Sequence, residues 1–127
     1  MESYDYFEKH TGFGVLSTAD TSGKVNAAVY ARPHVFEDGT LGFLTGDRLT
    51  RLNLQSNGQA VYLFREEPVE SQHYLGKRLY LKLLREETDA QTIDSVRRRR
   101  YGNDKDGQYL LVFEVVQELP LIGPGSE

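Results

Sequence analysis

Short apolar runs separated by turn-forming residues are the feature that most constrains the fold of this 127-residue chain. Two turns are clear, Asp20-Thr-Ser-Gly23 and Glu37-Asp-Gly39, and an Asp-Gly pair between apolar runs is a strong hairpin signal. Six strands are predicted, at residues 13–18, 24–36, 41–45, 60–64, 78–84 and 109–116. Hairpin spacing makes neighbouring strands antiparallel, so the pattern predicts a mainly β barrel or sandwich.

Three short helices are predicted between these strands, at residues 2–10, 49–57 and 89–100. The second ends at Ser56-Asn57-Gly58, which is a typical helix stop. The third begins at Thr88 or Asp89, either of which can cap its first turn. Because the helices do not alternate regularly with the strands, the sequence does not favour a parallel sheet.

Composition limits the class of protein. One domain spanning residues 1–127 is expected, because two domains of this total length would each have a poor core. The net charge of -4 argues against general nucleic-acid binding, and the absence of cysteine excludes disulfides and cysteine metal sites. No apolar run approaches the roughly 20 residues that cross a bilayer, and the acidic, aromatic N-terminus does not resemble a signal peptide. We therefore expect a cytoplasmic protein.

Two further patterns in the sequence argue against a nucleic-acid site and against a metal site. The basic run Arg97-Arg-Arg-Arg100 lies at the C-terminal end of a predicted helix with an acidic start, where the helix dipole favours cations. We therefore predict that this run does not bind nucleic acid. The three histidines, His10, His34 and His73, do not have ligand spacing on one helix, so no metal site is predicted.

The segment Leu44 to Asn57 carries the strongest functional signal. Arg48 and Arg51 lie three residues apart near a predicted helix start, where unpaired backbone N–H groups already favour anions. An anion such as phosphate would offset this accumulation of positive charge. The alternative is that both are surface arginines and that Asp47 neutralises one of them. The candidate phosphate-site residues are Thr45, Gly46, Arg48, Thr50 and Arg51.

The chain resembles the pyridoxamine 5'-phosphate oxidase-like family of FMN-binding split β-barrels. The resemblance covers residues 12–87 and, more loosely, the final strand. It is carried by Gly14-Val-Leu-Ser-Thr18, Ala31-Arg-Pro-His34, Asp38-Gly-Thr-Leu41 and Leu44 to Asn57. It implies a six-stranded antiparallel split β-barrel with a few short helices. It also implies a homodimer with FMN at the interface, and the tail from Leu119 to Gly125 is a candidate part of that interface.

The resemblance also implies roles for particular residues, although it identifies no catalytic residue. Tyr30, Ala31 and Arg32 would lie at the edge of the flavin ring, and Leu44, Thr45 and Gly46 would contact the flavin. Arg48, Thr50 and Arg51 would hold its phosphate, and Lys77 and Arg78 would reach it from a later strand. Many relatives have Ser-Arg-Lys where this chain has Arg48-Leu-Thr-Arg51, so the residue that contacts the phosphate stays open.

The function implied is that of an FMN-dependent oxidoreductase acting on a small molecule. We do not expect a true pyridoxamine 5'-phosphate oxidase, because the chain has no tryptophan and no C-terminal Arg-x-His-type segment. Two alternatives stay open. One is a non-enzymatic flavin-binding or electron-carrying protein, and the other is a relative that binds haem or a deazaflavin on the same barrel.

Overall fold

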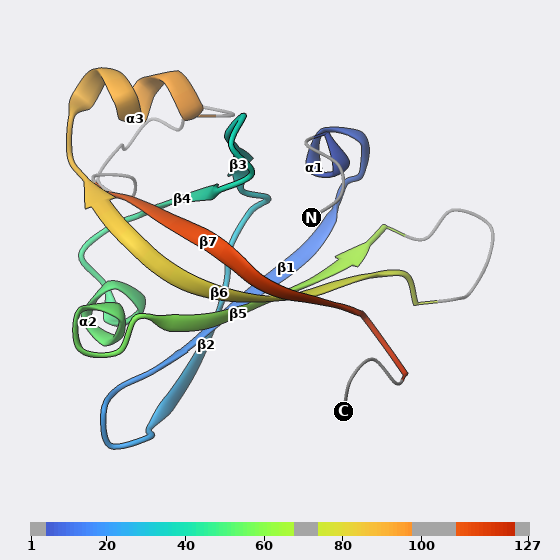
Figure 1. The fold of residues 1–127 in the computed structure, drawn as a ribbon, viewed down its shortest axis with the longest axis horizontal. Coiled ribbons are helices and arrows are strands. Elements are labelled where there is room, and N and C mark those ends of the chain that lie inside the picture. The colour runs from blue at the N-terminus through green and yellow to red at the C-terminus, as the bar shows by residue number, and fades with distance from the viewer. Residues whose placement is uncertain (1–4, 68–73, 98–108, 124–127) are drawn as a thin grey trace.

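The computed structural model describes residues 5–67, 74–97 and 109–123, which form one antiparallel sheet with three short helices around it (Figure 1). The strands are β1 (Gly12–Ala19), β2 (Val25–Val29), β3 (His34–Val35), β4 (Leu41–Thr45), β5 (Gln59–Glu66), β6 (Gly76–Glu87) and β7 (Tyr109–Pro120). The helices are α1 (Tyr6–Lys9), α2 (Leu49–Ser56) and α3 (Ala90–Val96). The strand order across the sheet is β2-β1-β5-β6-β7-β4-β3.

The mainly β, antiparallel architecture is confirmed, but the number of strands was predicted wrongly. The described residues contain seven strands rather than six, because the predicted run 24–36 is divided into β2 and β3. Residues 30–33 between them are irregular, and Pro33 has no N–H for a strand ladder. The division lets the chain cross from one edge of the sheet to the other, since β2 and β3 are the two edge strands.

The sheet is open rather than closed into a complete barrel. Within the described ranges, no ladder joins β2 to β3, so both strands keep one unpaired edge. The strong curvature nevertheless gives the sheet an inner face that holds the core. Leu16, Tyr62 and Leu79 form one cross-strand row on this face and are fully buried. Phe7 of α1 packs edge-on against the rings of Tyr62 and Phe64.

The helices largely match their predicted positions. The helix α2 begins and ends within one residue of the prediction, and Asp89 caps α3 by accepting a hydrogen bond from the Thr92 N–H at 3.0 Å. The predicted extension of α3 is wrong at Arg97, which has extended backbone, and residues 98–100 lie outside the described part. Of the predicted helix 2–10, the structure shows Tyr6–Lys9, and residues 1–4 are outside it.

The last strand is longer than predicted. β7 continues to Pro120, where its final residues pair with Lys77 and Arg78 of β6. β6 and β7 are therefore paired over nearly their whole length, in the middle of the sheet (Figure 1). None of the described helices is long and apolar enough to span a membrane.

Candidate functional site

The candidate site lies where β4 gives way to α2. β4 ends at the buried Thr45, and Gly46 and Asp47 lead to Arg48, which is the N-cap residue of α2. The Arg48 side chain makes no capping hydrogen bond, and the first turn contains no acidic residue. The N-cap side chain therefore does not satisfy the first backbone N–H groups in the way that Ser, Thr, Asp or Asn usually does at this position. Arg48 itself is exposed beside them.

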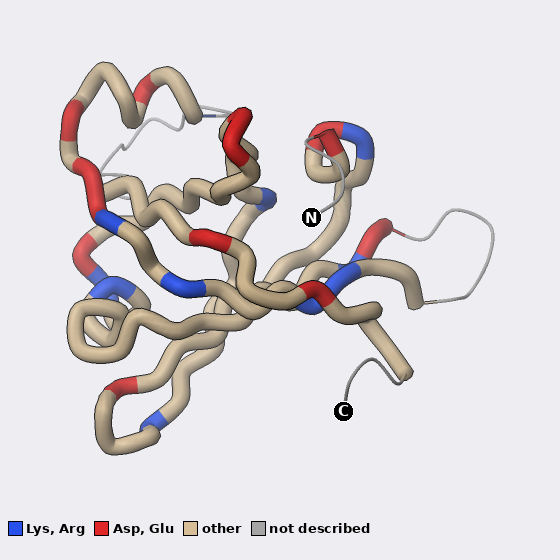
Figure 2. Tube along the Cα trace, in the orientation of Figure 1, with Lys and Arg blue, Asp and Glu red and all other residues tan. Residues whose placement is uncertain are grey.

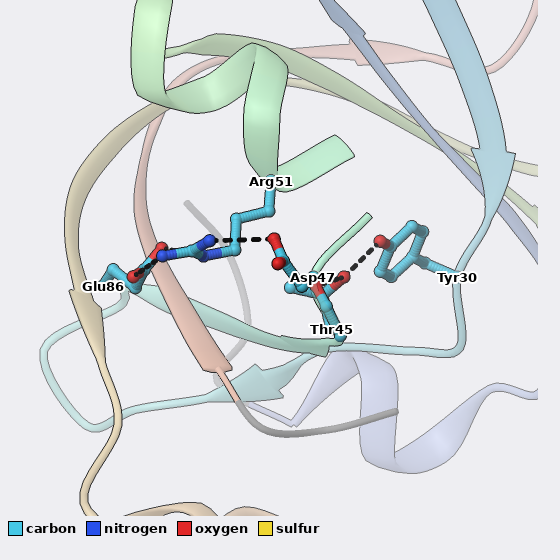
Figure 3. A network of polar contacts seen from close by, with 6 residues as sticks. Tyr30, Thr45, Asp47, Arg51 and Glu86 are labelled. Atoms are coloured by element: carbon cyan, nitrogen blue, oxygen red, sulfur yellow. Dashed lines mark hydrogen bonds and ion pairs between the residues drawn. The ribbon is translucent and has the colours of Figure 1, made fainter. Parts of the chain in front are cut away.

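The segment that follows β2 is tied to this place by hydrogen bonds. The hydroxyl of Tyr30 lies 2.7 Å from the hydroxyl of Thr45, and the hydroxyl of Tyr62 donates to the Tyr30 carbonyl at 3.0 Å. The structure thus brings Tyr30, Thr45 and Gly46 together with the start of α2. Figure 3 shows the Tyr30–Thr45 contact beside Asp47 and Arg51.

Arg51 makes an extensive set of contacts within the chain. Its Nε and Nη2 donate to the two carboxylate oxygens of Glu86, each at 2.8 Å, and its Nη1 donates to Asp47 Oδ1 at 3.0 Å (Figure 3). The guanidinium carbon also lies 3.8 Å from the ring centroid of Tyr109. The carboxylates of Asp47 and Glu86 therefore offset the positive charge that Arg48 and Arg51 bring to this helix start. The Asp47–Arg51 contact agrees with one part of the alternative, whereas Arg51 is not a plain surface arginine, because its side chain is only 17% exposed.

The electrostatics of this cluster stabilise the charged form of Arg51. The hydrogen bonds to Glu86, followed by its charge, raise the pKa of Arg51 above its ordinary value. The bidentate Arg51–Glu86 pair has the geometry in which guanidinium and carboxylate interact most strongly. Over the rest of the described chain, basic and acidic residues are interspersed (Figure 2).

The structure places four other predicted residues in different surroundings. Thr50 is a buried residue of α2, and Leu44 packs against the cluster of Ile93, Val96, Leu110 and Val112. Ala31 is exposed. The Arg32 guanidinium points to α1, where Nη1 donates to the carbonyls of Phe7 at 2.7 Å and His10 at 3.1 Å.

Lys77 and Arg78 are not brought to this site within one chain. Nine positions along β6 separate Lys77 from Glu86, a distance of about 30 Å in an extended strand. Lys77 forms an ion pair with Glu118, and Arg78 donates to the carbonyl of Pro120 at 2.7 Å. The two basic residues therefore hold the far end of the β6–β7 pair together.

A pocket of about 270 Å³ lies on the other side of α2, against the β1–β2 hairpin. Its apolar part consists of Val25, Leu49 and Leu52, all of them well exposed. Its lining includes none of the residues predicted for the flavin. It is lined by Asp20, Lys24, Val25, Asn26, Leu49, Leu52, Asn53 and Ser56.

Sequence reasoning missed Glu86 and Tyr109, the two long-range partners of Arg51. Glu86 is 35 residues from Arg51 in the chain, so no local spacing connects them. Asp47 was accessible to sequence reasoning, because an acidic residue four positions before an arginine commonly pairs with it. No group of three or more residues suited to a metal ion was found among the residues that the structure describes.

Comparison with solved structures places this fold among known proteins. An FMN-binding protein from Syntrophomonas wolfei subsp. wolfei has a TM-score of 0.77 and 22% identity, with 94% of this chain and 84% of that one covered. A proposed flavin reductase with a split barrel domain from Shewanella frigidimarina NCIMB 400 has a TM-score of 0.58 and 11% identity, covering 87% and 67%. The chain has the split-barrel fold.

A third comparison agrees with the family resemblance found in the sequence. A proposed pyridoxamine 5'-phosphate oxidase from Lactobacillus delbrueckii has a TM-score of 0.64 and 12% identity, with 91% of this chain and 88% of that one covered. Neither a protein-family model nor a curated protein sequence matches the chain. The split-barrel fold is thus shared at low sequence identity.

Proposed function

We propose that this chain binds FMN at the start of α2 and acts as a flavin-dependent oxidoreductase on a small molecule. The observation that carries the proposal is the uncapped start of α2, with the exposed Arg48 beside it and the Tyr30 segment fixed against the end of β4. A phosphomonoester carries a charge of roughly -1.5 to -2 and accepts hydrogen bonds from backbone N–H groups at a helix start. The split-barrel flavin proteins named above support the choice of a flavin.

The residues present fit a flavin phosphate in part. Arg48 and the first N–H groups of α2 supply positive charge and donors, and Gly46 adds no side chain next to them. Arg51 fits less well, because its fork already holds Glu86. In this proposal FMN supplies the redox chemistry, and the chain supplies binding and orientation.

We also propose that the functional form is a homodimer. The sheet face opposite the core carries two adjacent cross-strand rows of mostly apolar residues. One row is Val29, Val15 and Leu63, and the other is Ala27, Ser17, Val61 and Tyr80. Val29 is 65% exposed and Leu63 38% exposed, and a second copy of the chain would remove this apolar surface from water.

A dimer also offers a role for Arg78. This residue pairs with Leu63 in the strand register, so it continues the first apolar row. Within one chain Arg78 is far from the start of α2. In a dimer Arg78 would lie at the interface, where it would be able to contact the flavin bound by the second copy of the chain.

An absorbance spectrum of the purified protein tests the proposed cofactor. Flavin bands in the visible region are expected, whereas a Soret band would indicate haem and would overturn the proposal. Anaerobic mixing with NADH or NADPH then tests the proposed activity. Rapid bleaching of the flavin is expected for an oxidoreductase that uses these donors, and lack of bleaching with either would favour a carrier.

A further inference from the structure

The Arg51–Glu86 contact occupies the part of Arg51 that an incoming phosphate would need. Glu86 accepts from Nε and Nη2, which form one edge of the guanidinium fork, and phosphate oxygens bind such an edge in the same bidentate way. The Arg51 side chain is only 17% exposed, and Tyr109 covers one face of its guanidinium. A phosphate therefore has little access to Arg51 while Glu86 is in place.

Glu86 differs from Asp47 in how it reaches Arg51. Asp47 lies four residues before Arg51, so their pairing comes with the helix start itself. Glu86 comes from β6, at a position paired with Leu111 of β7, and is held there by the sheet. Its side chain is 26% exposed, so its carboxylate can be rehydrated if it is released. Replacement of the Glu86 carboxylate by a phosphate at Arg51 is therefore energetically feasible.

The charges around the start of α2 cancel in the free chain. Asp47 and Glu86 contribute two negative charges, and Arg48 and Arg51 contribute two positive charges. A phosphate that arrives beside Arg48 also experiences repulsion from the Glu86 carboxylate. Removing that carboxylate would thus free a guanidinium edge and remove a repelling charge at the same time.

We propose that Glu86 is a specificity-determining residue, which competes with the phosphate of a ligand for Arg51 and so sets how strongly the site selects phosphorylated ligands. The proposal rests on the proposed function in taking FMN as the ligand. Glu86 lowers the preference for FMN over riboflavin, because the phosphate must displace a carboxylate that is already bound. The remaining preference comes from Arg48 and the backbone of α2.

The substitution Glu86→Gln tests this directly, since it keeps the shape of the side chain and removes its charge. Titrations that follow flavin fluorescence are expected to show FMN bound at least about tenfold more tightly, the equivalent of one charge-assisted hydrogen bond. Riboflavin should bind as it does to the unaltered protein. The matched control is Glu87→Gln, which removes the neighbouring charge that pairs with Arg85 instead. Adding Arg51→Gln to the Glu86→Gln protein should abolish the gain.

Several results would overturn the proposal. Unchanged FMN affinity in Glu86→Gln, or an equal change for FMN and riboflavin, would leave Glu86 as a structural partner of Arg51. If Glu86→Gln does not fold, Glu86→Asp keeps the charge but shortens the reach, and a smaller gain in FMN affinity is then expected. Absence of any gain in folded Glu86→Asp would count equally against the proposal.

Inorganic phosphate separates failure of this proposal from failure of the proposed function. If neither flavin binds, the flavin proposal is wrong, but the thermal unfolding temperature with added phosphate still reports on the site. A larger phosphate-dependent rise in Glu86→Gln than in Glu87→Gln and the unaltered protein would support competition at Arg51. An equal rise in all three would overturn it.

Discussion

The hydroxyl groups of Tyr30 and Thr45 lie 2.7 Å apart, so the segment that leaves β2 is tied to the last residue of β4. The backbone carbonyl of the same tyrosine accepts a hydrogen bond from Tyr62 of β5 at 3.0 Å. Parts of the chain next to three different strands therefore meet at Tyr30. These contacts position Tyr30 beside the end of β4, where the flavin site is proposed.

Replacing Tyr30 by phenylalanine should weaken this tie while keeping the ring. The free energy of unfolding is expected to fall by about 1 kcal/mol, the typical net value of one hydrogen bond. Urea unfolding measures the change. Tyr74→Phe is the matched control, because Tyr74 is 56% exposed and its ring contact with Arg65 would remain. An equal effect of both substitutions would contradict a special role of the Tyr30 hydroxyl.

Replacing Arg48 by alanine should weaken FMN binding and leave riboflavin binding nearly unchanged. A charge-assisted hydrogen bond is worth roughly 1.5–3 kcal/mol, so a loss of at least about tenfold in FMN affinity is expected. The loss should shrink at high salt, because the side chain is exposed. Lys82→Ala removes an equal charge from an exposed position on β6 and should have little effect. Equal losses for both flavins would place Arg48 away from the phosphate.

The sequence predicted those parts of the fold that depend on local patterns. The turns at Asp20 and Asp38, the strand 41–45 and the helix that follows it all rest on residues close together in the chain. The division of the run 24–36 was missed, because an extended segment looks the same whether it stays in one ladder or crosses to another edge. Only the pairing of β2 with β1 and of β3 with β4 distinguishes the two cases.

The candidate site, too, was predictable only where it depends on residues close together in the chain. The resemblance assigned Tyr30, Thr45 and Arg48 to one flavin site, and the structure places the Tyr30 side chain against Thr45, three residues before Arg48. Their contact with a flavin stays a prediction. The pairing of Arg51 with Glu86 depends on the register between β6 and β7 and on the placement of α2. A distant ion pair of this kind leaves no spacing signal in a single sequence.

A charge placed on the outer face of the sheet should dissociate the proposed dimer. Leu63→Glu puts a carboxylate at the end of the apolar row that contains Val15 and Val29, next to Val15. Sedimentation at micromolar concentration is expected to give a dimer for the unaltered protein and a monomer for this variant. Leu52→Glu, at a 60% exposed position on α2, is the control and should stay dimeric. A flavin-loaded monomer of the unaltered protein would contradict the dimer.

The turn between β1 and β2 should make stability depend on pH in the acid range. The hydrogen bond from the Ser22 side chain, followed by that from the Lys24 N–H, lowers the pKa of Asp20 below its ordinary value of 3.8. A lowered pKa in the folded state adds stability above 3.8 that is lost as the pH falls through the lower, folded-state value. Urea midpoints measured from neutral pH into this acid range should fall less steeply in Asp20→Asn. Identical profiles would contradict this role of the turn.

Titration of the purified, flavin-free protein with FMN and with riboflavin is the most direct test of the central claim, that the start of α2 binds a flavin phosphate. Fluorescence quenching should saturate at one FMN per chain, with riboflavin bound at least about tenfold more weakly because it lacks the phosphate. Equal affinity for the two flavins would show that the phosphate is not recognised at this site. Failure of FMN to saturate the protein at all would contradict flavin binding by this chain.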